Sequence, residues 1–309
     1  MKREVVKIGT RKSKLAMWQA NYVANILDAG GYHSELIPIE TKGDKIQHVT
    51  LSKIGSKGVF TEELETMLRK GQIDLAVHSA KDLQSKLPQG FEVLSFCKRE
   101  SPDDVIIAEK EIDLNDPTLI LGTSSTRRVA MLKHYYPHIK TVNVRGNLQT
   151  RLEKLKSGRM DGLILAYAGV RRMNYESLIK YRFDTERFIP PVGQGSIAIE
   201  IHEEFATAKK EKIKRLTNHH LTEKMLLAER AFLGRMEGGC SIPVFGYAQI
   251  KLDGQIGLSG GIASLDGKQL IQRTVYGNKP EPLGISLAEE ILQSGGEKIL
   301  NDIKSLMSK

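Results

Sequence analysis

The chain of 309 residues has only two cysteines, few aromatic residues and no long apolar run. Cys97 and Cys240 form no C-x-x-C pair and show no metal-like spacing to histidine, so we expect neither a disulfide scaffold nor a metal site. The longest apolar runs, residues 105–108 and 163–166, are too short to span a bilayer and are typical of buried strands. The first residues contain no long apolar segment and no small-residue cleavage site. We therefore expect a cytoplasmic protein that does not bind a membrane.

The formal net charge of +9 makes nucleic acid a partner to consider, because lysines and arginines neutralise phosphates and release counterions. The sequence has no helix-turn-helix pattern, no zinc finger and no aromatic-rich ribonucleoprotein strand. Its densest basic run, residues 209–215, contains Glu211 and follows a helical period, which is typical of a solvated helix face. We therefore expect no nucleic-acid partner, and small anions are the better partners for the arginines.

Short β-rich runs alternate with helix-period runs through the first two thirds of the chain, which predicts an α/β fold of parallel βαβ units. Polar stretches with prolines at residues 99–102 and 189–191 are typical of hinges between domains. After the second hinge, the apolar residues 197–201 predict a strand that returns to the first domain. Two domains joined by two crossing segments follow from this pattern.

The pattern changes near residue 217 to one helix followed by antiparallel strands. Asp253-Gly254 and Asp266-Gly267 are typical hairpin turns, and a final helix is predicted near residues 285–293. These features indicate a small α+β domain at the end of the chain. The sequence thus predicts three domains, which comprise residues 1–98 with 193–216, residues 102–190, and residues 217–309.

Several arginines follow predicted strands. In the segment GTSSTRR, residues 122–128, backbone N–H groups, hydroxyls and two guanidinium groups meet at the positive end of a helix. Taken alone, this segment could equally be an ordinary N-cap followed by surface arginines. The segment GTRKS at residues 9–13 repeats the arrangement, and further arginines stand at positions 145, 151, 171 and 172. Because arginine binds carboxylates in a bidentate manner, the whole set predicts a substrate with several carboxylates.

Asp82 ends the segment HSAKD, residues 78–82, just past a predicted strand, where ligands bind in open α/β sheets. A carboxylate among cations stays ionised, which suits the stabilisation of a developing positive charge, and the alternative role is a helix cap. The glycine-rich residues 55–60 could form a lid and lack the residue order of a nucleotide-binding loop.

Cys240 lies in the glycine-rich segment EGGCSIP, residues 237–243. A thiol in such a loop could anchor a group covalently, and its alternative role is that of a small buried apolar side chain. Cys97 lies on an apolar strand pattern, and we assign it the second role.

In order along the chain, these motifs resemble those of the porphobilinogen deaminase family, also called the hydroxymethylbilane synthases. The resemblance runs from residue 9 into the third domain. It rests on the ordered series Arg11-Lys12-Ser13, Lys57-Gly58, His78-Ser79-Ala80-Lys81-Asp82-Leu83, Gly122-Thr123-Ser124-Ser125, Arg145-Gly146-Asn147, Val192-Gly193-Gln194-Gly195 and Glu237-Gly238-Gly239-Cys240. Three positions differ from the residues common in the family, namely Ser56, Ala80 and Thr126, and none removes a charged or nucleophilic group.

The resemblance implies a transferase of tetrapyrrole (haem) biosynthesis that deaminates porphobilinogen and links the units head to tail into linear hydroxymethylbilane. It implies a dipyrromethane cofactor held by a thioether bond to Cys240, and it makes Asp82 the catalytic carboxylate. The residues that match cofactor-binding positions are Lys81, Asp82, Thr123, Ser124, Ser125, Arg127, Arg128, Arg145 and Gly146. Those that match substrate-binding positions are Arg11, Ser13, Lys57, Ser79, Arg145, Arg151, Arg172 and Gln194.

The family fold is similar to type II periplasmic binding proteins, with two α/β domains and a third, small α+β domain that carries the cofactor. We expect a monomer. The rival hypothesis is a non-catalytic two-domain anion-binding protein. It explains the arginines equally well, but it gives no reason for the third domain or for the Cys240 loop.

Overall fold

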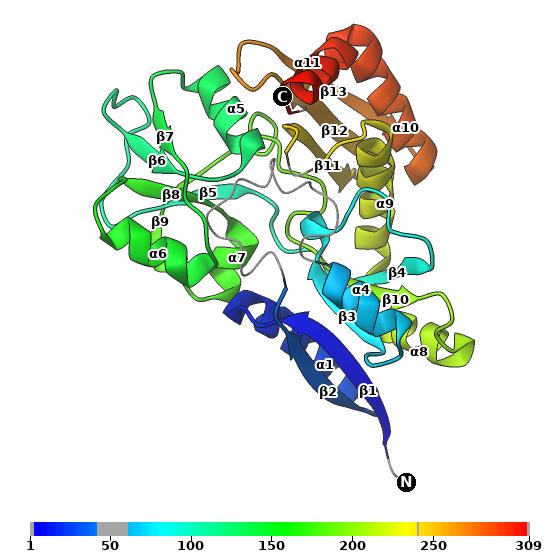
Figure 1. Cartoon of the computed structure of the whole chain (residues 1–309). Coiled ribbons are helices and arrows are strands. Elements are labelled where there is room, and N and C mark those ends of the chain that lie inside the picture. Colours follow the sequence, from blue (N-terminus) through cyan, green and yellow to red (C-terminus); the bar gives the residue numbers. More distant parts are fainter. Residues whose placement is uncertain (1–2, 42–60, 240, 308–309) are drawn as a thin grey trace.

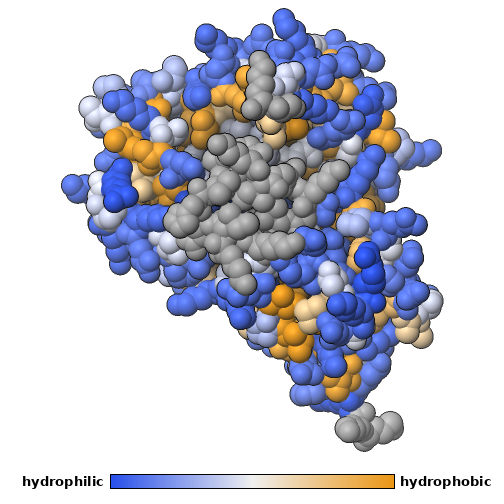
Figure 2. Space-filling view, viewed as in Figure 1, coloured by the Kyte–Doolittle hydropathy of each residue, from blue (hydrophilic) through white to orange (hydrophobic). Residues whose placement is uncertain are grey.

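The computed structural model describes residues 3–41, 61–239 and 241–307 of the chain. Their strands form two five-stranded sheets and one three-stranded sheet, which lie apart from one another in Figure 1 with helices against each. The predicted lid at residues 55–60, with Lys57, lies outside the described residues, and so does Cys240. Among the described helices, none is both long and apolar enough to cross a membrane. On the face shown in Figure 2, hydrophilic residues predominate and the apolar ones form small separate groups.

The first sheet, drawn mostly in blue and cyan in Figure 1, has the strand order β2-β1-β3-β10-β4. Strand β1 is parallel to β2 and β3, whereas β10 is antiparallel to β3 and β4. The predicted parallel βαβ unit is present as β1-α1-β2, and β10 makes the sheet mixed, because it is reached from the second sheet without a crossover helix and can enter in the opposite direction. The strands are β1 (Glu4–Arg11), β2 (Tyr32–Ile39), β3 (Leu75–Ser79), β4 (Phe91–Phe96) and β10 (Ile197–His202).

Helix α1 (Lys14–Ala29) packs on this first sheet. The hydroxyl of Ser13 accepts a hydrogen bond from the backbone N–H of Ala16 and caps the helix, and Gly30 follows its last residue. The buried side chains recur at helical spacing, and they include Ala20, Val23, Ala24 and Leu27. The other helices beside this sheet are α4 (Glu62–Arg69) and α8 (Thr207–Thr217).

The second sheet, drawn mainly in green in Figure 1, has the order β7-β6-β8-β5-β9. Strand β6 is parallel to β7 and β8, whereas β5 is antiparallel to β8 and β9, so this sheet is also mixed. Its strands are β5 (Asp104–Ile107), β6 (Ile120–Gly122), β7 (Lys140–Val142), β8 (Gly162–Ala166) and β9 (Ile179–Arg182). Its helices are α5 (Thr126–Tyr135), α6 (Leu148–Lys156) and α7 (Tyr167–Arg172), with the 3₁₀ turn η2 (Glu176–Leu178).

Local contacts set the ends of two elements in this part of the chain. Strand β7 ends at Val142 because its partner β6 ends opposite, at Gly122. Helix α6 begins at Leu148 because the side chain of Asn147 accepts a hydrogen bond from the Thr150 N–H, 3.0 Å away, and caps the helix.

The third sheet is an antiparallel meander of β11 (Val244–Ile250), β12 (Ile256–Ala263) and β13 (Leu270–Gly277). Both predicted hairpin turns are present, and their glycines, Gly254 and Gly267, have positive φ angles of 82° and 74°. The helices of this part are α9 (His220–Arg235), α10 (Pro280–Ile291) and α11 (Glu297–Met307), with the π-helical segment η3 (Leu292–Gly296) between the last two. Helix α10 begins before residue 285 because Pro280 suits a first helical turn, and α11 was not predicted.

The carboxylate of Glu229 joins three parts of the chain. Glu229 lies on α9 and is fully buried, and its oxygens are 2.5 Å and 3.3 Å from the guanidinium nitrogens of Arg99, which lies between β4 and β5. The same carboxylate accepts hydrogen bonds from the backbone N–H groups of Gly193 and Ala248, each at 2.8 Å. Both segments that connect the first two sheets are thereby fixed to the third sheet.

Candidate active site

A cavity of about 1390 Å³ is lined by residues of all three sheets and of the loops that follow their strands. Predicted site residues that line it are Arg11, Ser13, Ser79, Lys81, Asp82, Ser124, Ser125, Arg127, Arg128, Arg145, Gly146, Arg151, Arg172 and Gln194. Thr123 is buried beside this wall, and its hydroxyl accepts a hydrogen bond from the Ser125 N–H at 3.2 Å. Lys57 and Cys240 belong to the residues that are not described.

Asp82 lies on the cavity wall at the end of the 3₁₀ turn η1 (Ala80–Asp82), which directly follows β3. Its side chain is partly buried and, among the described residues, no donor forms a hydrogen bond with its carboxylate. Burial lowers the pKa of Lys81 to about 8 and that of Arg151 to about 10, and the charge of Asp82 opposes both shifts. The site thus places one carboxylate, available to a ligand, among cations.

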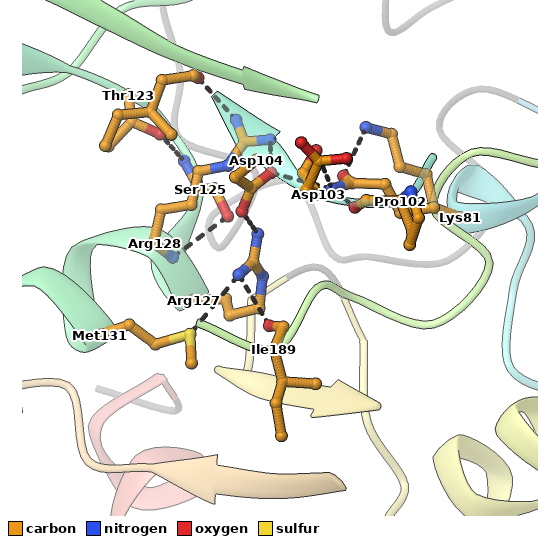
Figure 3. A network of polar contacts seen from close by, with 12 residues as sticks. Lys81, Pro102, Asp103, Asp104, Thr123, Ser125, Arg127, Arg128, Met131 and Ile189 are labelled. Carbon is orange, nitrogen blue, oxygen red and sulfur yellow. Dashed lines mark hydrogen bonds and ion pairs between the residues drawn. The ribbon is translucent and has the colours of Figure 1, made fainter. Parts of the chain in front are cut away.

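Arg127 and Arg128 share a buried carboxylate, that of Asp104 (Figure 3). One oxygen of Asp104 accepts from Arg128 at 2.6 Å, and the other accepts from Arg127. The remaining terminal nitrogens donate to backbone carbonyls, Arg128 to Ile164 at 2.7 Å and Arg127 to Ile189 at 3.0 Å. Burial alone would raise the pKa of Asp104, but the two guanidinium groups outweigh it and hold that pKa well below its usual range.

Sequence reasoning missed Asp104. It is the first residue of β5 and is fully buried, with an apolar strand directly after it. An acidic residue that enters a buried strand needs a cationic partner, and this was the available signal. The sequence could not show that the partners are the two arginines at the start of α5.

Gln194 lies between the two larger sheets and is fully buried. Its amide nitrogen donates to the Pro102 carbonyl at 2.6 Å and to an Asp104 oxygen at 2.9 Å. Its amide oxygen accepts from the Lys81 ammonium at 3.2 Å. Both polar atoms of the Gln194 amide thus form hydrogen bonds within the protein, and the expected contact with substrate stays a prediction.

Arg145, in the loop before α6, and Arg151, on α6, both line the cavity. Gly146 has a φ of 118°, and a Cβ at this position would lie 2.8 Å from the Thr150 side chain, so only glycine fits. The Arg151 Nε donates to the Gly146 carbonyl at 2.8 Å, and the Lys154 ammonium donates to the Arg145 carbonyl at 2.9 Å. Side chains of α6, including that of Arg151, thus hold the loop that presents Arg145.

Arg172, at the end of α7, joins the second sheet to the first. One of its terminal nitrogens donates to the Gly195 carbonyl at 2.7 Å, and its guanidinium group lies over the ring of Trp18. Burial lowers the pKa of Arg172. On the first sheet, the hydroxyl of Ser79 accepts a hydrogen bond from the Gln19 amide at 2.9 Å, which fixes the end of β3.

Residues on both sides of Cys240 line the cavity. Glu237 has a positive φ of 48°, which is uncommon outside glycine, and its carboxylate accepts from the Lys304 ammonium of α11 at 2.5 Å. A Cβ on Gly238 would lie 2.6 Å from the Leu233 side chain, so the chain passes close to α9 here. On the other side, the buried hydroxyl of Ser241 has no partner among the described residues.

Two family models match the chain. One, "Porphobilinogen deaminase, dipyromethane cofactor binding domain", matches residues 6–210, and the other, "Porphobilinogen deaminase, C-terminal domain", matches residues 224–293. The chain is similar to the porphobilinogen deaminase of Desulfosudis oleivorans, with 49% identity over 97% of this chain and 98% of the relative. It is also similar to the porphobilinogen deaminase of Cytophaga hutchinsonii, with 48% identity over 99% of each.

Two solved structures are similar to part of the chain. The VFT2 domain of Bordetella pertussis BvgS matches 69% of this chain and 85% of that domain at 15% identity, with a TM-score of 0.41. The methionine-binding protein MetQ matches 69% of this chain and 89% of its own at 12% identity, with a TM-score of 0.44. These likenesses are too distant to support an argument about function.

Proposed function

The chain belongs to the porphobilinogen deaminase family, and from this premise we propose how its own side chains perform the reaction. The protein is a transferase of tetrapyrrole biosynthesis that deaminates porphobilinogen and joins the units into hydroxymethylbilane, with dipyrromethane as its cofactor. The rival hypothesis of a non-catalytic anion-binding protein is not favoured, because relatives that are 49% and 48% identical over nearly the whole chain bear the enzyme's name.

The cavity fits a cofactor with several carboxylates. The Nε–H groups of Arg127 and Arg128 are buried without a partner among the described residues, and unpaired buried donors favour an anionic ligand. When bound, dipyrromethane supplies the pyrrole carbon to which the first substrate unit is joined. We infer that Cys240 binds it through a thioether. The residues that hold it are Lys81, Asp82, Thr123, Ser124, Ser125, Arg127, Arg128, Arg145 and Gly146.

The placement of Asp82 is the observation that carries the proposed mechanism. As ammonia leaves the aminomethyl group of porphobilinogen, positive charge develops on the pyrrole ring and its N–H becomes a stronger donor. The Asp82 carboxylate, which no described donor occupies, accepts that N–H and stabilises the charge. Lys81 and Arg151 lie near this carboxylate, whose charge favours their protonated forms.

Carboxylate recognition by arginine orients the substrate. Arginines at the ends of strands in both larger sheets face one cavity, so acidic side chains of a single substrate can be bound from two sides. The residues that we assign to substrate are Arg11, Ser13, Ser79, Arg145, Arg151 and Arg172. The same assignment for Lys57 rests on the sequence alone.

We also infer three domains with the bounds given by the sequence, residues 1–98 with 193–216, residues 102–190, and residues 217–309. The support is that each contains the strands of one sheet. A monomeric state is part of the proposal, and light scattering of the purified protein tests it. A cytoplasmic location is part of the proposal, and the low cysteine content supports it.

Turnover and intact mass test the proposed function together. The purified protein, supplied with porphobilinogen, should release ammonia as hydroxymethylbilane forms, and Ehrlich's reagent should stain the denatured protein because it reacts with pyrroles. The denatured protein should also gain mass in steps of one deaminated porphobilinogen unit. A protein that binds porphobilinogen but shows neither ammonia release nor a mass increase would contradict the proposal.

A further inference from the structure

Gln194 lies where the segment that leads to β10 passes close to the turn η1. Gly193 and Gly195 on either side have positive φ angles of 78° and 91°. A Cβ on Gly193 would lie 2.8 Å from the backbone nitrogen of Lys81, and one on Gly195 would lie 2.3 Å from the Glu100 carbonyl oxygen. Only glycines allow this approach, so the Gly-Gln-Gly sequence places the Gln194 side chain beside Lys81.

The surroundings fix the orientation of the Gln194 amide. Its nitrogen lies 2.6 Å from the Pro102 carbonyl oxygen and 2.9 Å from an oxygen of Asp104, and both groups can only accept hydrogen bonds. The amide oxygen must therefore point the other way, where the Lys81 ammonium donates to it at 3.2 Å. Asp104 is itself held by the two arginines of α5 (Figure 3), so the carboxylate that faces the Gln194 amide nitrogen is fixed in place.

The charged groups that face Lys81 come from three elements. Asp82 lies on its own turn, Arg127 and Arg128 lie on α5, and Asp104 lies on β5. Burial and the two arginines disfavour the ammonium form, whereas the two carboxylates and the amide oxygen of Gln194 favour it. The amide oxygen is the only one of these favouring groups that forms a hydrogen bond with the ammonium group among the described residues.

We propose that Gln194 is a positioning residue, which holds the Lys81 ammonium at the cavity wall beside Asp82, and is not a substrate contact. Its complete burial and its fully engaged amide support this role. The purpose of holding Lys81 there rests on the proposed function, since a charged Lys81 serves to bind the carboxylates of the cofactor. The contact itself can be tested without turnover.

Competitive labelling measures the ionisation of Lys81 directly. The cofactor-loaded protein is treated with trace acetic anhydride between about pH 6 and 11, a range that brackets the ordinary lysine pKa, and labelling of the Lys81 peptide is read by mass spectrometry. In Gln194→Met, which keeps the length but removes the acceptor, the labelling midpoint should fall by roughly one pH unit. In Gln194→Glu, which keeps an acceptor oxygen toward Lys81 and, when protonated, a donor toward Pro102, the midpoint should stay close to that of the parent protein.

Gln19→Met is the matched control, because Gln19 is also a buried glutamine that lines the cavity but bonds to Ser79 instead of Lys81. Its Lys81 midpoint should stay at the parent value. An unchanged midpoint in Gln194→Met, or an equal fall in Gln194→Met and Gln194→Glu, overturns the proposal. The alkaline limb of the pH dependence of kcat should shift together with the pH midpoint of Lys81 labelling. If the parent protein lacked turnover, the proposed function would fail while the labelling result stood.

Discussion

The guanidinium group of Arg172 lies over the indole ring of Trp18, with 5.4 Å between the guanidinium carbon and the ring centroid. Trp18 belongs to α1 on the first sheet and Arg172 ends α7 on the second, so the contact joins the two sides of the cavity. Because Trp18 is the only tryptophan of the chain, its fluorescence reports on this contact. A cation over an indole stabilises by about 0.5–2 kcal/mol, depending on its exposure to solvent.

Arg172→Ala should therefore shift the emission of Trp18 to longer wavelength, because the ring loses its cover, and should lower the free energy of unfolding by about 1 kcal/mol. Emission spectra and urea unfolding measure the two effects. Arg171→Ala is the control, since the neighbouring Arg171 instead pairs with Glu100 near the surface. Identical spectra for the two variants would contradict the contact.

Asp104→Asn should destabilise the protein by about 3–5 kcal/mol at neutral pH, because it removes the negative partner of two buried guanidinium groups. The pKa of Asp104 is held below its usual range, so its stabilising effect is complete above the unfolded-state pKa and is lost as the pH falls below that value. The free energy of unfolding of the parent should thus fall more steeply than that of the variant between about pH 5 and pH 2. Denaturant unfolding at several pH values measures both slopes.

Asp103→Asn serves as the control for this prediction, since the arginine that Asp103 contacts, Arg182, is half exposed. Its loss of stability should be smaller than that of Asp104→Asn. Parallel pH slopes for the parent and Asp104→Asn would show that Asp104 is not the partner that the arginines require.

Arg128→Leu and Arg145→Leu should both impair turnover, because each removes a guanidinium group from the cavity wall, and the lost contact costs about 2–5 kcal/mol in binding. Only Arg128→Leu should also lower the melting temperature clearly, because Arg128 is buried and pairs with Asp104. Steady-state kinetics and thermal melting separate the two effects. Near-normal turnover in both variants would contradict the role of arginine in carboxylate recognition.

The sequence predicted elements whose signals are local. The two hairpin turns of the third sheet depend on neighbouring residues, and both are present. The sequence did not predict the direction of β10, which is antiparallel to β3 and β4. Strand direction depends on a connection far along the chain, and nothing within the residues of a buried strand shows it. Helix α11 was not predicted, although it carries a buried apolar stripe at residues 299, 300 and 303.

The residues of the candidate site also differ in whether a local sequence signal reveals them. The arginines and Asp82 were found because they follow strands, which is a local property. Asp104 and the contact of Gln194 with Lys81 were not found, because their partners lie far along the chain: Asp104 pairs with residues 23 and 24 positions away, and Gln194 contacts a lysine 113 positions away. Only folding brings such groups together, so a single sequence shows the parts of the site without their pairing.

Asp82→Asn should reduce turnover about a hundredfold or more while leaving the melting temperature unchanged, because it keeps the shape and removes the charge that stabilises the transition state. Asp82→Glu keeps the charge at a changed distance and should be slower than the parent but faster than Asp82→Asn. Initial rates of porphobilinogen consumption measure the series. Turnover of Asp82→Asn above about a tenth of the parent rate would exclude electrostatic stabilisation by this residue.

In the proposed function, the covalent attachment of the cofactor depends on Cys240. The described residues on both sides of it line the cavity, and the buried hydroxyl of Ser241 beside it has no partner among them. A thioether survives denaturation and reduction, whereas a disulfide adduct is released by reductant and a noncovalent ligand is lost on unfolding. Mass spectrometry of the denatured, reduced protein should therefore show an adduct, and peptide mapping should place it at Cys240.

Cys240→Ser should lose both this adduct and nearly all activity, because a hydroxyl is a far poorer nucleophile than a thiolate. Cys97→Ser is the control: burial raises the pKa of the Cys97 thiol to about 12, so this thiol stays protonated and unreactive. That variant should keep the adduct. A fully active preparation in which Cys240 carries no adduct would refute covalent attachment, since joining the first unit would then not need a primer bound to the protein through this thiol.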